Sequence, residues 1–184
     1  MVRVTCIAGL VHDGKVYLGG DSAAARGWDM LVRADPKVFR NGSYVIGFTS
    51  SWRMGQLLRY AFDPPEPSNE QRQDLFRFMA TVFVDAVREC LKTGGYATKD
   101  KEQESSGEFL VGLGGRLFII YSDYQVAESL DWIAAVGCGA QVALGALYAQ
   151  RESQAAPHDR VMAALDAAER FSNGVRGPFK VEHV

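Results

Sequence analysis

The sequence predicts an α+β protein in which antiparallel strands form sheets that pack between pairs of helices. Short apolar runs rich in glycine and β-branched residues fill residues 1–60 and return after residue 108, which is typical of strands. Elsewhere apolar residues recur at three- and four-residue spacing, which is typical of helices. With 184 residues, 47% hydrophobic and 23% charged, the chain is expected to form one globular domain over 1–184.

Turn residues divide the apolar runs of the first part into two predicted β-hairpins. The sequences Asp13-Gly14 and Asn41-Gly42 favour the tight turns that join antiparallel strands. Antiparallel pairing is also favoured because no helical pattern separates these strands. The predicted strands are 4–11, 16–21, 37–40, 43–48, 108–113, 117–122, 132–136 and 179–184.

Two pairs of helices are predicted, one pair after each block of strands. The broad apolar stripe of the second helix indicates a face that packs on the core. The polar stretch 98–107 has no apolar pattern and is predicted to be a flexible loop. The predicted helices are 52–62, 74–92, 140–151 and 157–170.

Composition excludes several classes of function. Twenty basic and 22 acidic side chains give a formal charge of −2, which offers no general electrostatic case for nucleic-acid binding. The three widely spaced cysteines favour neither a zinc site nor a disulfide framework. No run of about eighteen apolar residues is present, as a membrane span would need. We therefore expect a cytoplasmic protein that binds no nucleic acid or membrane and uses no metal or organic cofactor.

The residues of the two hairpins resemble the proteasome β-subunit and its bacterial relative, the HslV peptidase. In that family an acidic residue follows the N-terminal threonine by sixteen positions, and a lysine follows it by thirty-two. Thr5, Asp21 and Lys37 have both spacings. The similarity continues in the segment 135–139 and in the last helix and strand. The chain is thus identified as resembling an N-terminal nucleophile (Ntn) hydrolase, for which a four-layer αββα sandwich is expected.

The resemblance implies a role for each matched residue. Thr5 would be the nucleophile, and its own α-amine, with a pKa near about 8, would be the base. Lys37 would stabilise developing negative charge, and Asp21 would pair with that lysine. Gly47 would offer its backbone amide to the oxyanion, and Cys138 takes the place of the serine in the family's Gly-Ser-Gly segment.

Each of these residues also has a plain structural interpretation. Thr5 alone is most simply a strand residue, and Asp21 a turn residue. Lys37 alone fits a solvated strand edge, and Gly47 a β-bulge. Cys138 alone fits a small side chain in a tight turn. The joint spacing favours the catalytic site.

Two departures from the family pattern bear on activity. Residues 1–4 precede Thr5, so a free α-amine requires the removal of this possible propeptide, and the β-branched Val4 crowds the bond to be cut. Arg170 stands where the family has a second acid, late in the last helix, with Ser172 and Asn173 close by.

The family pattern assigns the substrate pocket to Ala24, Asp35, Phe39 and Thr49. Ala24 and Phe39 would accept an apolar side chain, whereas Asp35 would favour a basic one. The sequence leaves both alternatives open.

The resulting hypothesis is a threonine endopeptidase that hydrolyses peptides or unfolded proteins. The resemblance implies self-assembly into rings or helical stacks, and it is compatible with a partner ATPase. The alternatives are a catalytically inactive structural or assembly subunit of the same fold, and an Ntn amidohydrolase that acts on a small amide.

Overall fold

The computed structural model describes residues 5–26, 29–96, 98–100 and 103–184. Its strands are β1 (Cys6–His12), β2 (Lys15–Gly20), β3 (Ala23–Arg26), β4 (Asp29–Val32), β5 (Val38–Asn41), β6 (Tyr44–Phe48), β7 (Thr98–Asp100), β8 (Gln103–Ser105), β9 (Phe109–Leu113), β10 (Arg116–Ile120), β11 (Val126–Glu128), β12 (Ile133–Gly137) and β13 (Lys180–His183). Its helices are α1 (Trp52–Tyr60), α2 (Leu75–Phe78), α3 (Val84–Thr93), α4 (Ala140–Ala149) and α5 (Pro157–Phe171). The chain is therefore of the α+β class, as predicted.

Two antiparallel sheets form the centre of the molecule. One has the strand order β12-β1-β2-β13, and the other has the order β11-β10-β9-β6-β5. Each pairs strands that are far apart in the sequence, because β12 joins β1, and β9 joins β6. The first and last strands of the chain thus lie in the same sheet, on either side of β2.

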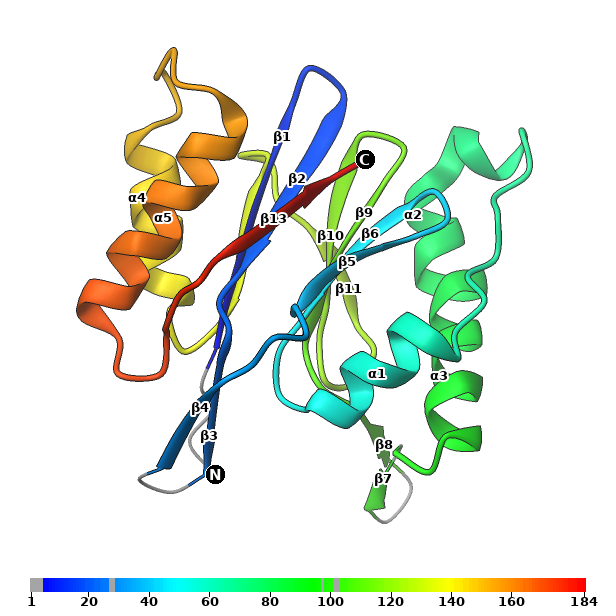
Figure 1. Ribbon diagram of the computed structural model, residues 1–184. Coiled ribbons are helices and arrows are strands. Elements are labelled where there is room, and N and C mark those ends of the chain that lie inside the picture. The colour runs from blue at the N-terminus through cyan, green and yellow to red at the C-terminus, as the bar shows by residue number, and fades with distance from the viewer. Residues whose placement is uncertain (1–4, 27–28, 97, 101–102) are drawn as a thin grey trace.

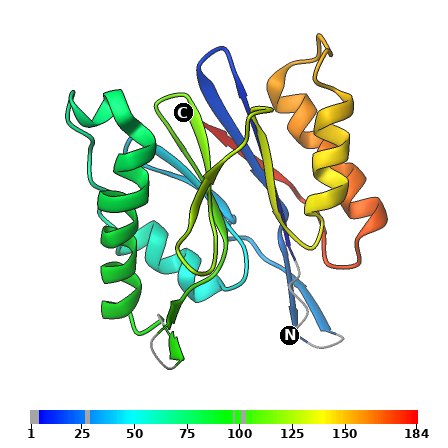
Figure 2. The same ribbon diagram turned by 180° about the vertical axis from the view of Figure 1, so that it is seen from behind.

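Helices cover the outer faces of both sheets. Figure 1 shows α4 and α5 against the first sheet and α1, α2 and α3 against the second, and Figure 2 shows the same order from behind. Three apolar clusters fill the spaces between these layers. The middle cluster, between the two sheets, includes Ile7 and Leu18 from the first sheet and Val45 and Leu110 from the second. Burial of these side chains holds the sheets together.

Both predicted hairpins are confirmed, although the second turn consists of Gly42 and Ser43, not Asn41 and Gly42, because Asn41 pairs with Tyr44. Asp13 and Gly14 have φ values of 48° and 69°, and Gly42 has a φ of 59°. Such positive φ values are those that tight two-residue turns demand. The hairpin β1–β2 pairs Ile7, near the start of β1, with Gly20, the last residue of β2. The residue before β1 and the residue after β2 therefore lie at the same end of the sheet.

The four predicted helices are confirmed, with one difference in detail. The helix predicted at 74–92 is α2 followed by a π-helical segment (Met79–Phe83) and α3. The apolar stripe of this continuous segment packs on the second sheet, as predicted, and Phe83 lies fully buried there.

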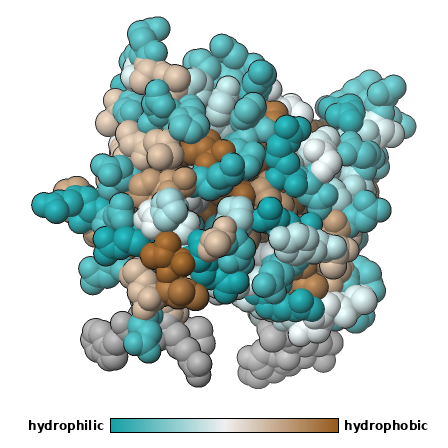
Figure 3. All heavy atoms as spheres, viewed as in Figure 1, coloured by the Kyte–Doolittle hydropathy of each residue, from teal (hydrophilic) through white to brown (hydrophobic). Residues whose placement is uncertain are grey.

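The prediction of a loop at 98–107 is wrong, since β7 and β8 form a short hairpin there. A second hairpin, β3–β4, was also not predicted, and Figure 1 shows it projecting below the two sheets. Its first strand is rich in alanine, which is depleted in strands, so the sequence gives no strand signal there. Its second strand exposes Met30, Leu31 and Val32. Figure 3 shows brown, apolar atoms low on this face of the molecule.

Candidate active site

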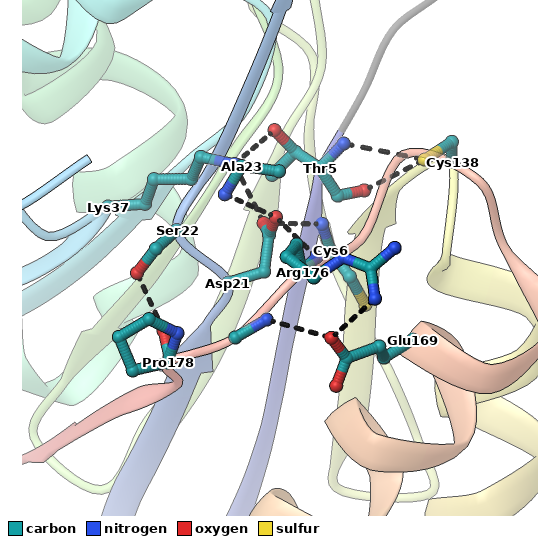
Figure 4. Close-up of polar contacts among 11 residues, drawn as sticks. Thr5, Cys6, Asp21, Ser22, Ala23, Lys37, Cys138, Glu169, Arg176 and Pro178 are labelled. Atoms are coloured by element: carbon teal, nitrogen blue, oxygen red, sulfur yellow. Dashed lines mark hydrogen bonds and ion pairs between the residues drawn. The ribbon is translucent and has the colours of Figure 1, made fainter. Parts of the chain in front are cut away.

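Three strand ends converge on a buried polar cluster of Thr5, Asp21 and Lys37. Thr5 directly precedes β1, Asp21 directly follows β2, and Lys37 directly precedes β5. The Lys37 Nζ atom lies 2.8 Å from the Thr5 Oγ1 atom and 2.7 Å from the Asp21 Oδ1 atom. The exposed fractions of the three residues are 3%, 1% and 2% in sequence order. Figure 4 shows the three side chains pointing toward one another.

The Asp21 carboxylate is held by donors on both of its oxygens. Oδ1 accepts hydrogen bonds from Lys37 Nζ and, at 3.0 Å, from the Cys6 amide. Oδ2 accepts from the Ala23 amide at 2.9 Å and from the Arg176 amide at 3.3 Å. These donors fix the carboxylate and compensate its burial, so it can hold the lysine in one place.

Burial acts on the charge of Lys37. Removal from water lowers the pKa of the Lys37 ammonium below its ordinary value of 10.5, and the neighbouring Asp21 carboxylate opposes that shift. The cation therefore depends on Asp21, with which it forms an ion pair whose two side chains are 1% and 0% exposed. The ion pair with Asp21 thus holds the Lys37 ammonium within hydrogen-bond distance of the Thr5 hydroxyl.

Cys138 contacts the backbone of Thr5 on the other side. Its Sγ atom lies 3.4 Å from the Thr5 nitrogen and 3.4 Å from the Thr5 carbonyl oxygen. The Gly139 amide also donates to that carbonyl, at 3.3 Å. Gly137 has a φ of 98°, and a Cβ at this position would lie 2.3 Å from the same oxygen, so the turn requires glycine. The turn between β12 and α4 thus brings Cys138 to Thr5.

Cys6 lies on the opposite face of the strand from this cluster. Its side chain is fully buried in the apolar layer between the first sheet and its helices. Burial, with a smaller contribution from Asp21, raises the pKa of the Cys6 thiol to about 12. Cys6 is therefore a packing residue, as its position next to Thr5 predicts.

Gly47 lies inside the second sheet, and its amide is turned away from the cluster. The Phe48 amide donates to the Lys37 carbonyl, so by antiparallel alternation the Gly47 amide is directed to β9, where Leu110 is its partner. A Cβ on Gly47 would lie 2.6 Å from Ile7 Cγ2. The geometry gives Gly47 a packing role between the sheets and does not support the expected oxyanion role.

The four expected pocket residues differ in burial and in the contacts that they make. Phe39 is 3% exposed and lies in the apolar cluster under α1 and α3. Thr49 is 1% exposed, and its hydroxyl donates to the Glu108 carbonyl. Ala24 lies half-buried in β3, and the Asp35 side chain is 38% exposed.

Asp35 is neutralised by a bidentate ion pair with Arg33. The Arg33 Nε and Nη2 atoms donate to its two oxygens at 2.7 Å and 2.6 Å. This contact holds the pKa of the Asp35 carboxyl below its ordinary value. A basic substrate side chain would therefore have to compete with Arg33 for the Asp35 carboxylate.

Sequence reasoning missed Glu169 and the segment that it holds. Arg170, at the position expected for a second acid, is exposed to solvent. Its neighbour Glu169 accepts a hydrogen bond from the Gly177 amide and forms an ion pair with Arg176. Arg176 in turn donates its amide to Asp21, as Figure 4 shows. The only sequence signal was an acid one position before the expected one.

Two other kinds of site are not found among the residues that the structure describes. In those ranges no group of three or more His, Cys, Asp or Glu side chains could hold a metal ion. Within the same ranges, no helix has the length and apolar character needed to cross a bilayer.

Comparison with solved structures identifies the fold. No family model matches the sequence, and no curated protein matches it either. The chain nevertheless has the proteasome-β/HslV-like Ntn fold, which confirms the resemblance seen in the sequence.

Individual structures show how far the similarity extends. BPH from Thiobacillus denitrificans has a TM-score of 0.75 and 20% identity, with 97% of each chain covered. Its complex with epoxomicin has a TM-score of 0.77, 21% identity and the same coverage. Eukaryotic HslV from Trypanosoma brucei has a TM-score of 0.68 and 19% identity, with 97% of this chain and 98% of that chain covered.

Proposed function

We propose that the chain is a threonine-type peptidase whose nucleophile is the Thr5 hydroxyl. The observation that carries the proposal is the 2.8 Å contact between Lys37 Nζ and Thr5 Oγ1, inside a cluster that is closed to solvent. A threonine hydroxyl needs such activation because it is a weak nucleophile at neutral pH. The proteasome-β/HslV-like fold and its layers, taken as the αββα sandwich, support the same function.

The proposed reaction begins when the Thr5 Oγ1 atom attacks the carbonyl carbon of a peptide. Its proton passes to the Thr5 α-amine, which is free once residues 1–4 have been removed; these residues lie outside the part of the chain that the structure describes. The nearby Lys37 ammonium stabilises the negative charge that develops on the oxygen. The C–N bond then breaks, the leaving amine takes the proton, and an ester to Thr5 remains. Water hydrolyses the ester and restores the hydroxyl.

Cys138 and Asp21 have supporting roles in this proposal. Cys138 contacts the Thr5 nitrogen and therefore orients the group that becomes the base. Asp21 holds Lys37 through a buried ion pair. Gly47 is not included, because its amide is directed into the sheet.

A catalytically inactive subunit of the same fold is the second candidate. It is favoured by the four residues before Thr5, because the Thr5 nitrogen is an uncharged peptide amide while they remain attached. The β-branched Val4 precedes the bond that would have to be cut. An Ntn amidohydrolase that acts on a small amide is a further alternative.

Intact-mass measurement of the purified chain, followed by assays with a fluorogenic peptide panel, tests these candidates. The peptidase proposal expects a chain that begins at Thr5 and an activity that falls roughly 10⁴-fold or more in Thr5→Ala. An intact N-terminus without activity would support the inactive subunit. Activity that is unchanged in Thr5→Ala would contradict every mechanism through Thr5, and hydrolysis of small amides alone would support the amidohydrolase.

The proposal extends to assembly and location. The similarity to HslV supports a homo-oligomeric ring or stack that encloses the sites and receives peptides or unfolded proteins. A partner ATPase and a cytoplasmic location belong to the same proposal. Mass photometry of the native protein tests the assembly, because a monomeric protein would contradict an enclosed chamber.

A further inference from the structure

The indole of Trp52 lies beside the Thr5–Lys37 pair. The Lys37 Nζ atom, 2.8 Å from Thr5 Oγ1, is also 5.5 Å from the centre of the Trp52 ring. Thr5 and Lys37 are 3% and 2% exposed, whereas Trp52 is only partly buried. On this side of the pair, the indole therefore exposes more surface to an incoming group than Thr5 or Lys37 does.

Trp52 is fixed in place by neighbours on several sides. It is the first residue of α1, directly after Ser51, whose side chain caps the helix by accepting from the Arg53 and Met54 amides. The Phe48 ring packs edge-on against the indole, with the ring centres 5.4 Å apart and the planes at 82°. The Arg33 guanidinium lies 4.0 Å from the ring centre. The indole is thus a rigid wall.

The wall carries no unpaired charge. Arg33 stacks on the indole while two of its three guanidinium nitrogens, Nε and Nη2, donate to Asp35 at 2.7 Å and 2.6 Å. Recognition of a charged substrate side chain would require this bidentate pair to open, which loses two charge-assisted hydrogen bonds. The wall therefore favours an uncharged neighbour.

There is little room behind the wall. The hollow beside Trp52, which Asp35, Phe48 and Gly55 help to line, has a volume of about 10 Å³. That volume holds about one water molecule. A leucine or phenylalanine side chain that is directed from Thr5 toward this hollow would fit only if the indole moved, and Phe48 and Arg33 hold it in place.

We propose that Trp52 limits the substrate side chain next to the cleaved bond to small uncharged groups, such as those of glycine, alanine and serine. This inference rests on the proposed peptidase function. Replacing Trp52 by alanine would join the site to the hollow and create a pocket bordered by Phe48 and the Arg33–Asp35 pair. The pocket would then accept large apolar side chains, and still not charged ones.

The test is a peptide panel that varies only the residue before the cleaved bond: alanine, leucine, phenylalanine, arginine or glutamate. The wild type should have a kcat/KM for alanine at least about tenfold above the other four. Trp52→Ala should raise kcat/KM for leucine and phenylalanine about tenfold or more and leave alanine within about threefold. The matched control is Trp132→Ala, because Trp132 is also partly exposed, at 55%, and lies next to the opposite end of β12 from Gly137.

A second measurement separates this inference from the function itself. Uncleaved peptides are titrated onto Thr5→Ala and onto Thr5→Ala/Trp52→Ala, which reports side-chain preference without turnover. A wild type that prefers large or charged residues, or a Trp52→Ala profile that matches Trp132→Ala, would overturn the role of Trp52. That role would also be excluded if neither Thr5→Ala chain distinguishes alanine from phenylalanine in binding. If the chains prefer alanine over phenylalanine in binding but the wild type cleaves no peptide, the role of Trp52 would stand and the proposed peptidase function would be contradicted.

Discussion

The carboxylate of Glu169, in the last turn of α5, accepts a 3.1 Å hydrogen bond from the backbone amide of Gly177. The neighbouring Arg176 amide donates to Asp21, and the Ser22 amide donates to the Arg176 carbonyl. Glu169 therefore anchors the segment that supports one oxygen of the buried carboxylate. Through that segment, α5 is connected to the Thr5–Lys37 pair.

Two replacements of Glu169 should show whether its hydrogen bond to Gly177 or its negative charge holds this segment. Glu169→Ala leaves the Gly177 amide without its acceptor and should lower the free energy of unfolding by about 1 kcal/mol, with a loss of peptidase kcat. Glu169→Gln keeps an acceptor oxygen and should retain most of both. Urea unfolding and kinetics of the two variants measure this. Equal losses in both variants would point to the ion pair with Arg176 instead.

Breaking the buried ion pair should be costly. Lys37→Met leaves the Asp21 carboxylate buried without its cation, and we expect the free energy of unfolding to fall by about 3–5 kcal/mol. The exposed pair of Arg88 and Asp85 provides a control, since Arg88→Met should cost about 0.5 kcal/mol or less. Chemical denaturation measures both changes. A similar small cost for both variants would mean that the Asp21 site is open to water.

The Lys37 ammonium should lose its proton at a lower pH than an ordinary lysine does. Because burial lowers its pKa below 10.5, the folded chain releases this proton before the unfolded chain does. The stabilisation from this linkage is present above pH 10.5 and is lost as the pH falls through the folded pKa. NMR titration of the Lys37 side chain measures the midpoint directly. A midpoint at or above 10.5 would contradict the expected direction.

Gly47 should prove to be a packing residue. Gly47→Ala places a Cβ 2.6 Å from Ile7 Cγ2, and we expect a loss of about 1–3 kcal/mol in unfolding free energy. Gly145→Ala, in α4 with no heavy atom within 4 Å of the new Cβ, should stabilise by about 0.5–1 kcal/mol. Thermal unfolding compares the two. A stable Gly47→Ala protein with severely reduced kcat would restore the oxyanion role.

Cys138 should be the first thiol to react with an alkylating reagent. It is exposed, whereas Cys6 is fully buried with a pKa raised to about 12, and burial also raises the pKa of Cys90. Because Cys138 contacts the Thr5 backbone, one added group should also abolish peptidase activity. Peptide mapping after brief iodoacetamide treatment identifies the site. Prior modification of Cys6 or Cys90 would contradict the order, and full activity after labelling Cys138 would place it outside the reaction.

The central part of the fold and of the candidate site could be predicted from the sequence. Asp13-Gly14 and Gly42 predict the hairpins, because few other residues accept the positive φ that these turn positions require. The resemblance to the proteasome β-subunit family, through the spacing of Thr5, Asp21 and Lys37, then implies that these three residues form a site. Local sequence carries this information because each residue adjoins an element that the sequence marks clearly.

Other parts depend on contacts that no local pattern encodes. The Arg176–Asp21 contact joins residues 155 positions apart, so the support from Glu169 could not be seen. Trp52 at the start of an amphipathic helix is more often a core residue than a neighbour of a reactive group. The amide direction of Gly47 follows from the sheet register, which only the assembled strands define.

The buried cluster draws on both sheets, since Thr5 and Asp21 adjoin strands of one and Lys37 adjoins β5 of the other. Neither sheet alone contains the pair that the proposed chemistry requires. In a nascent or half-folded chain, Thr5 would therefore lack its contact with Lys37. That contact would form only when the two sheets pack together. Under the proposed function, a newly made chain could therefore cleave no peptide before its folding is complete.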